Sequence, residues 1–115
     1  MPKIFHIARE ADWQAALTGG TYRISTVGRS LEDEGFIHCS QRHQVAGVAN
    51  AFYRGRADLV LLVIDTDLVA PDIRYEASDG GTERFPHIYG PLNVESVVAV
   101  EPLKPRKDGA FSPLS

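Results

Sequence analysis

Three of the four histidines in this chain share a setting that could place them in one site. His6, His38 and His87 each lie between apolar or proline neighbours, in Phe-His-Ile, Ile-His-Cys and Pro-His-Ile respectively. Imidazole exchanges protons near neutral pH and can also ligate metals, so three such residues could support acid-base chemistry or binding. The fourth, His43, lies early in a predicted helix, and we expect it at the surface.

The alternation of side chains along a strand predicts which way two of these histidines point. Successive residues of a strand face opposite sides, so Phe36, His38 and Ser40 share one face. By the same argument, His6 lies on the face opposite its two apolar neighbours. If both strands line one cleft, His6 and His38 bracket a ligand there, with Ser40 at the mouth, where a helix is expected to begin.

Other interpretations of these residues remain open. Each histidine could be buried and bound to a main-chain carbonyl, with a purely structural role. Ser40 could be the N-cap of the following helix. A three-histidine metal site is disfavoured, because no two of His6, His38 and His87 have the spacing of metal ligands on a helix. We therefore predict no metal.

Further polar residues lie close to the predicted strand ends. Glu34 and Glu76 could accept a proton or bind a ribose hydroxyl, or could be solvated charges. Gln44, one turn into the predicted helix, could bind a ligand or face water. Tyr22 and Tyr89 could stack on a base or fill space in the core.

Several familiar signatures are missing from the sequence. No Gly-x-Ser-x-Gly elbow of a serine hydrolase occurs, and Gly80-Gly81 is a turn rather than a phosphate-binding glycine loop. Cys39 is the one cysteine, so it cannot form an internal disulfide, and we expect it to be a small buried hydrophobe.

The composition is that of an ordinary globular domain. A chain of 115 residues predicts a single domain over 1–115, ordered over about 3–103, with a flexible tail at 104–115. The net charge of −3 argues against non-specific nucleic-acid binding. Residues 1–30 do not resemble a signal peptide, and the longest apolar run, 59–64, is too short to cross a membrane. We expect a cytoplasmic protein without a membrane partner.

The order of the helices and strands that must position these residues indicates an α+β domain, with two helices near the N-terminus and a strand-rich second half. The run 58–65 lacks polar alternation, which is typical of a central strand buried on both faces. Residues 85–92 contain two prolines and are expected to be more loop than strand. The remaining predictions are strands at 3–8, 21–25, 36–39, 73–76 and 94–100, helices at about 10–17 and 40–54, a helical turn after Ser30 that ends at Gly35, and a turn at 78–82.

Two stretches resemble a known family. EGFIHCS at 34–40 and FPHIYGPL at 85–92, with His6-Ile7 and Tyr75-Glu76, resemble the small bacterial family called domain of unknown function 952. The resemblance covers about residues 4–103.

A more distant resemblance implies a fold and an activity. The order of residues 6–8 and then 37–40 is similar to that of RNA 2′-phosphotransferases, which have the ADP-ribosyltransferase-like fold and bind NAD in a cleft between two small packed β-sheets. The resemblance implies that His6 holds the nicotinamide-side ribose and that residues 38–40 line the pocket. The arginines that bind RNA phosphate in those enzymes have no clear counterpart here, which argues against RNA phosphate transfer.

We therefore predict an ADP-ribosyltransferase-like enzyme that acts at the ribose anomeric carbon, with NAD as substrate rather than as a tightly bound cofactor. The alternative is a non-catalytic module that binds a small molecule or a peptide in the same histidine-lined cleft. The sequence does not indicate an oligomeric state. We assign binding to His6, Tyr22, Ser40, Gln44 and Tyr89, and catalysis to His38 and His87 with Glu34 or Glu76, with His87 and Tyr89 on a loop that closes the cleft.

Overall fold

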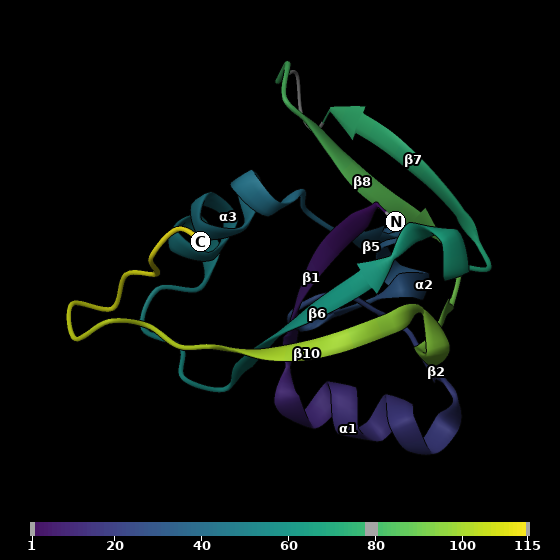
Figure 1. Cartoon of the computed structure of the whole chain (residues 1–115), viewed down its shortest axis with the longest axis horizontal. Coiled ribbons are helices and arrows are strands. Elements are labelled where there is room, and N and C mark those ends of the chain that lie inside the picture. Colours follow the sequence, from purple (N-terminus) through teal and green to yellow (C-terminus); the bar gives the residue numbers. More distant parts are fainter. Residues whose placement is uncertain (1, 78–80, 115) are drawn as a thin grey trace.

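The computed structural model describes residues 2–77 and 81–114 and has an α+β architecture of small antiparallel sheets (Figure 1). Two sheets have three strands, in the orders β1-β6-β10 and β5-β8-β7, and two are strand pairs, β2-β9 and β3-β4. The strands are β1 Lys3–Arg9, β2 Thr21–Tyr22, β3 Ile24–Thr26, β4 Arg29–Ser30, β5 Ile37–His38, β6 Leu59–Asp65, β7 Asp72–Ala77, β8 Arg84–Tyr89, β9 Leu92–Asn93 and β10 Val97–Leu103.

Helices are short and lie mostly in the first half of the chain, as predicted. The α-helices are α1 Glu10–Gly19, α2 Leu31–Glu34 and α3 Val45–Phe52, and the 3-10 turns are η1 Arg42–Gln44, η2 Thr66–Leu68 and η3 Val94–Ser96. The predicted turn at 78–82 lies largely outside the described residues.

The central strand β6 separates two hydrophobic cores, which is why its first six residues are all apolar. All seven of its residues are buried, as predicted for 58–65. Val60, Leu62 and Ile64 pack in the core that α1 covers, whereas the alternate residues pack in the core that α3 covers. In Figure 1, α1 lies beside β10, and α3 lies with the C-terminus on the other side of the sheet.

The tail contributes to the second core. Phe111 is buried there, and its main chain is bound to the Asn50 side chain, with N–H to Oδ1 at 2.7 Å and O to Nδ2 at 3.0 Å. The sequence expectation of a flexible tail did not take account of this anchor on α3.

The expectation that residues 85–92 are mainly loop is wrong, because β8 is the middle strand of the second sheet. Pro86 is tolerated because the N and O atoms of a strand residue point to the same side. Its oxygen accepts a hydrogen bond from Cys39 N–H at 3.0 Å, so the missing N–H faces the side where β5 has already ended at His38. His87 and Tyr89 therefore lie on a strand rather than on a closing loop.

Two further predictions about element ends are wrong. Ser40 is not an N-cap: it lies in an isolated bridge with Phe5, where both N–H groups donate to the opposite carbonyl at 2.7 and 2.8 Å. Gln41 is the N-cap of η1 instead. The last strand starts at Val97 and continues through Pro102, since β10 is an edge strand.

The segment that leads into β5 is confirmed in detail. Ser30 and Asp33 form the capping box expected from their spacing, with Asp33 N–H to Ser30 Oγ at 3.1 Å and Ser30 N–H to Asp33 Oδ2 at 3.3 Å. Gly35 then ends α2 with φ of 89°, a left-handed conformation that favours glycine. This sharp end places Glu34 beside the start of the strand that carries His38.

Candidate functional site

A cleft of about 580 Å³ opens where the two larger sheets meet α3 and the β3-β4 hairpin. A volume of this size is typical of small-molecule sites. The lining comes from β1 (His6, Ile7), the hairpin (Ser25, Thr26, Val27, Arg29), β5 and its continuation (His38, Cys39, Ser40), α3 and its end (Val48, Phe52, Tyr53) and β8 (Phe85, His87).

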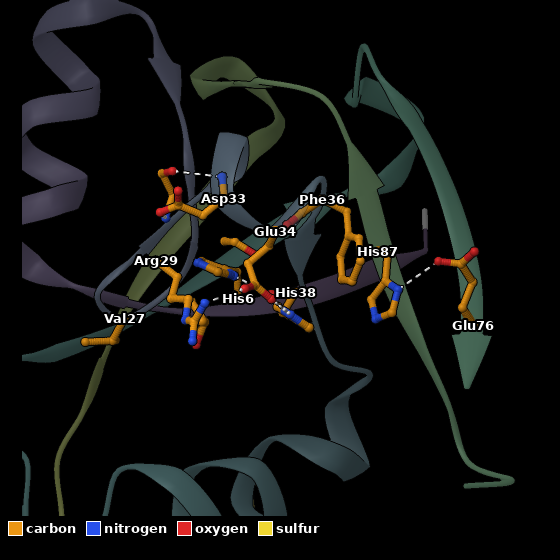
Figure 2. Close-up of polar contacts among 12 residues, drawn as sticks. His6, Val27, Arg29, Asp33, Glu34, Phe36, His38, Glu76 and His87 are labelled. Atoms are coloured by element: carbon orange, nitrogen blue, oxygen red, sulfur yellow. Dashed lines mark hydrogen bonds and ion pairs between the residues drawn. The ribbon is translucent and has the colours of Figure 1, made fainter. Parts of the chain in front are cut away.

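His38 and His87 lie side by side in the wall of this cleft, because they are register partners on β5 and β8. Their ring centroids are 5.2 Å apart, with the planes at 79°. Each ring has a carboxylate neighbour: Glu34 Oε1 lies 3.5 Å from His38 Nε2, and Glu76 Oε1 lies 2.9 Å from His87 Nδ1 (Figure 2). The structure thus brings together the four residues predicted to be catalytic, as two histidine-glutamate pairs.

Phe36 fixes the orientation of both imidazoles. Its ring stacks on His87 at a centroid distance of 4.1 Å with 18° between the planes, and meets His38 edge-on at 4.7 Å. Figure 2 shows Phe36 beside the His87 ring. The alternation along the strand correctly placed Phe36 and His38 on one face, but it did not indicate the stacking partner, which comes from β8.

His6 and His38 both line the cleft, and they also contact each other directly. His6 Nδ1 donates to the main-chain oxygen of His38 at 2.5 Å, since a carbonyl only accepts. Its Nε2 then accepts from the Tyr22 hydroxyl at 2.9 Å. Burial lowers the pKa of His6 to about 4, which keeps the ring neutral. Both ring nitrogens are occupied, so ligand binding by His6 stays a prediction that this geometry does not favour.

Three residues assigned to binding have other partners and do not line the cleft. Tyr22 is buried beneath His6. Gln44 is buried as well: its Oε1 accepts from Gln41 N–H at 2.9 Å, and its Nε2 donates to Arg84 O at 2.8 Å. The Tyr89 hydroxyl donates to Glu76 Oε1 at 2.5 Å. Ser40 does line the cleft.

The surroundings of the two histidine-glutamate pairs lower the pKa of His38 and the pKa of Glu76, each for a different reason. Burial lowers the pKa of His38, an effect that Glu34 opposes and His87 reinforces. The Tyr89 hydroxyl and then His87 lower the pKa of Glu76 by hydrogen bonding to its carboxylate. His38 is therefore neutral and able to accept a proton at pH 7, while Glu76 is ionised.

Sequence reasoning missed the residues that close the cleft. Arg29 follows the hairpin turn, with a side chain that is 64% exposed, and its Nη1 donates to Glu34 Oε2 at 3.2 Å. Helical spacing places Phe52 on the same face of its helix as Val45 and Ala49, yet Phe52 is 75% exposed while the other two are buried. The Tyr53 hydroxyl is hydrogen-bonded to Thr26, which joins α3 to the hairpin. No local pattern marks these residues, because they meet only when α3 packs.

Three sequence predictions remain: the exposure of His43, the role of the Cys39 thiol and the absence of a metal site. His43 is exposed, as predicted. Cys39 is a buried free thiol whose pKa is raised by burial, which confirms its role as a small hydrophobe. Within residues 2–77 and 81–114, no three His, Cys, Asp or Glu side chains are grouped to hold a metal ion, and no helix is long and apolar enough to cross a membrane.

These features define a small α+β protein whose antiparallel sheets enclose a histidine-lined cleft. The chain belongs to the DUF952 family, described as protein of unknown function, whose family model matches residues 7–100. It is similar to the crystal structure of protein CC0527 from Caulobacter crescentus, with 37% identity, a TM-score of 0.82, and coverage of 96% of this chain and 93% of that one. The solution NMR structure of CC0527 gives 38% identity, a TM-score of 0.81, and coverage of 97% and 93%. None of the functionally curated proteins matches.

Proposed function

We propose that the cleft binds NAD or a related nucleotide and that the protein is an ADP-ribosyltransferase-like enzyme acting at the ribose anomeric carbon. The observation that carries this proposal is the pairing of His38 and His87 in the wall of a cleft of about 580 Å³, each beside a glutamate. The ADP-ribosyltransferase-like fold and a cytoplasmic location belong to the same proposal. Two small sheets that meet at a cleft support the fold assignment.

The shape of the cleft suggests how a nucleotide lies in it. Phe52 and Tyr53 on one side and Phe85 on the other offer aromatic faces to a base. The ribose then lies against the imidazoles of His38 and His87.

In the proposed reaction, the bond between the ribose anomeric carbon and the nicotinamide nitrogen breaks, and its electron pair leaves with nicotinamide. A hydroxyl of water or of an acceptor forms the new bond to that carbon, and its proton passes to the neutral imidazole of His38. Glu34 and Glu76 act through the histidines they contact, rather than on the ribose, because neither carboxylate lines the cleft. Positive charge that develops on the ribose is stabilised through space by the ionised Glu76 carboxylate behind His87.

NMR titration tests the proposal directly. Saturating NAD or ADP-ribose should move the amide signals of residues 6, 38 and 40 and the imidazole signals of His38 and His87, but not those of exposed His43. Free nicotinamide should accumulate with NAD, and His38→Ala should slow its release by about a hundredfold or more. Unmoved signals at all three amides would show that the cleft does not bind the nucleotide.

A second candidate is a non-catalytic module that binds a small molecule or a peptide. The observation in its favour is that no Asp or Glu occurs among the described residues that line the cleft, so no carboxylate touches a bound ribose. Binding that is lost in His38→Ala, without nicotinamide release by the parent protein, would favour this candidate. A blank ligand screen combined with lower thermal stability of His38→Gln would instead indicate a purely structural role for His38.

A further inference from the structure

We propose that Arg29 receives a phosphate group of the bound nucleotide and, in doing so, releases Glu34 to hold His38. This inference rests on the proposed function for the identity of the ligand. It adds an anion-binding residue to the cleft and a link from that residue to the proton acceptor.

Arg29 is the one lysine or arginine among the described residues that line the cleft. It follows Gly28, whose φ of 83° makes the turn that brings β4 back along β3. A guanidinium has five N–H donors arranged as a planar fork that matches phosphate oxygens. Its contact with Glu34 is made by Nη1, so the exposed side chain retains donors for a ligand in the cleft.

Glu34 is shared between two partners, one oxygen for each. Oε2 accepts from Arg29 at 3.2 Å, while Oε1 lies 3.5 Å from His38 Nε2, at the long limit of a hydrogen bond (Figure 2). Since Arg29 is mostly exposed, its ion pair with Glu34 contributes little to stability. A phosphate that engages the fork with two oxygens competes effectively for the same cation. Glu34 is then free to turn fully to His38.

The groups around His38 determine what this exchange does. Glu34 faces it from α2, His87 from β8 and His6 from β1, and Arg29 on β4 contacts Glu34. Burial and His87 hold the pKa of His38 down, while Glu34 raises it. A shorter contact with Glu34 raises the pKa of His38 further, so phosphate binding makes His38 a stronger base when the substrate is in place.

A second ion pair on the same helix supplies a matched control. Arg23 Nη1 donates to Glu32 Oε2 at 3.0 Å, and both side chains are exposed, but neither lines the cleft. Arg23→Gln therefore removes the same charge and the same kind of contact with α2 without touching the proposed site.

The test is an NMR titration of each variant with inorganic pyrophosphate, and separately with ADP-ribose, while the His38 imidazole is followed against pH. In the parent protein and in Arg23→Gln, pyrophosphate should bind and raise the midpoint of His38. Arg29→Gln should weaken binding by about tenfold or more, the effect of losing a charge-assisted hydrogen bond. Glu34→Gln should keep the binding but lose more than half of the midpoint shift.

Two results would overturn the inference: equal pyrophosphate affinity in Arg29→Gln and the parent, or a midpoint shift of full size in Glu34→Gln. The proposed function fails separately. If pyrophosphate binds through Arg29 but NAD does not move the signals of the cleft, the proposal of a nucleotide ligand is refuted and the anion site is retained. If Arg29→Gln and Arg23→Gln bind NAD equally well, the role of Arg29 is refuted and the nucleotide site is retained.

Discussion

The imidazole of His6 donates a hydrogen bond to the main-chain carbonyl of His38 across 2.5 Å. His6 belongs to the first three-stranded sheet and His38 to the second, so this contact joins the two sheets at the base of the cleft. The bridge between Phe5 and Ser40 lies beside it and adds two main-chain hydrogen bonds. The position of His38 in the cleft therefore depends on a buried histidine that holds its backbone.

We predict that His6→Ala lowers the free energy of unfolding by about 3 kcal/mol, because it leaves a cavity and removes partners from a buried carbonyl and from Tyr22. Tyr22→Phe should cost about 1–3 kcal/mol, since His6 Nε2 loses its donor. Urea denaturation measures both. His43→Ala, at an exposed position, should stay within about 0.5 kcal/mol of the parent. A His6→Ala protein as stable as the parent would contradict the joining role.

The stability of the fold should also fall in mild acid because of His6. Burial holds the pKa of folded His6 at about 4, whereas in the unfolded chain it is about 6.5. The unfolded state therefore binds the extra proton between these values, so this contribution is complete above pH 6.5 and is lost as the pH falls towards 4. The loss reaches about 3 kcal/mol at most.

Comparison with His6→Gln isolates that effect, because His38 and the carboxylates titrate in both proteins. The advantage of the parent over His6→Gln in urea should shrink from pH 7 to pH 4.5. The imidazole signals of His6 in the folded parent should show a ring that is still mostly neutral at pH 5. Parallel stability curves, or a His6 ring that titrates near pH 6.5 in the folded state, would disprove the assignment.

The parts of the fold that sequence reasoning predicted are those fixed by local chemistry. The first six residues of β6 are all apolar because both faces of the strand are covered, and the capping box of Ser30 and Asp33 needs only its own four residues. The incorrect predictions concern residues whose partners lie far away in the sequence. Ser40 looks like an N-cap until Phe5, 35 positions earlier in the chain, pairs with its backbone. Pro86 argues against a strand, but its oxygen accepts from Cys39 just past the end of β5, and only the donor that a proline lacks is missing from the ladder.

The candidate site divides in the same way. The alternation of side chains brought His38 to the cleft, and the recurring histidine setting drew attention to His87. The sequence pattern did not separate His6 from the other two histidines, because all three have apolar neighbours. The Tyr22 side chain that covers His6 comes from a different strand, β2. The sequence did not mark Arg29 as a site residue either, because an arginine after a glycine turn is common. It lines a cleft only because α3 and β8 form the other walls.

Gly90, the one glycine of the FPHIYGPL segment, should not accept a larger side chain without loss of stability. A Cβ atom at this position would lie 2.9 Å from Pro71 Cβ and 3.3 Å from Pro71 Cγ, atoms of a rigid ring. Gly90→Ala should therefore cost about 1–3 kcal/mol, which is typical of overpacking. Gly47→Ala is the matched control: it lies within α3 with open space around the added methyl, and should stabilise by about 0.5–1 kcal/mol. Equal effects of the two changes in urea would contradict the close contact.

The Glu76 carboxylate should be detectable through the ionisation of Tyr89. The hydroxyl of Tyr89 and Nδ1 of His87 both approach Glu76 Oε1, at 2.5 and 2.9 Å. The hydrogen bond to Glu76, and to a lesser extent its negative charge, raise the pKa of Tyr89, because the phenolate would lose the bond and face a carboxylate. Glu76→Gln should therefore return the pKa of Tyr89 towards the ordinary value of about 10.

Carbon-13 NMR of the Tyr89 ring against pH measures this change, and Glu95→Gln, an exposed carboxylate on η3, should leave the titration of Tyr89 unaltered. The same Glu76→Gln sample reports on the catalytic pair: if Glu76 orients His87, the His87 ring signals shift while the stacking of Phe36 holds the ring in place. A Tyr89 titration that is identical in Glu76→Gln and the parent would mean that the carboxylate does not reach this strand in solution, and His87 would then lack the partner through which the proposed mechanism has Glu76 act.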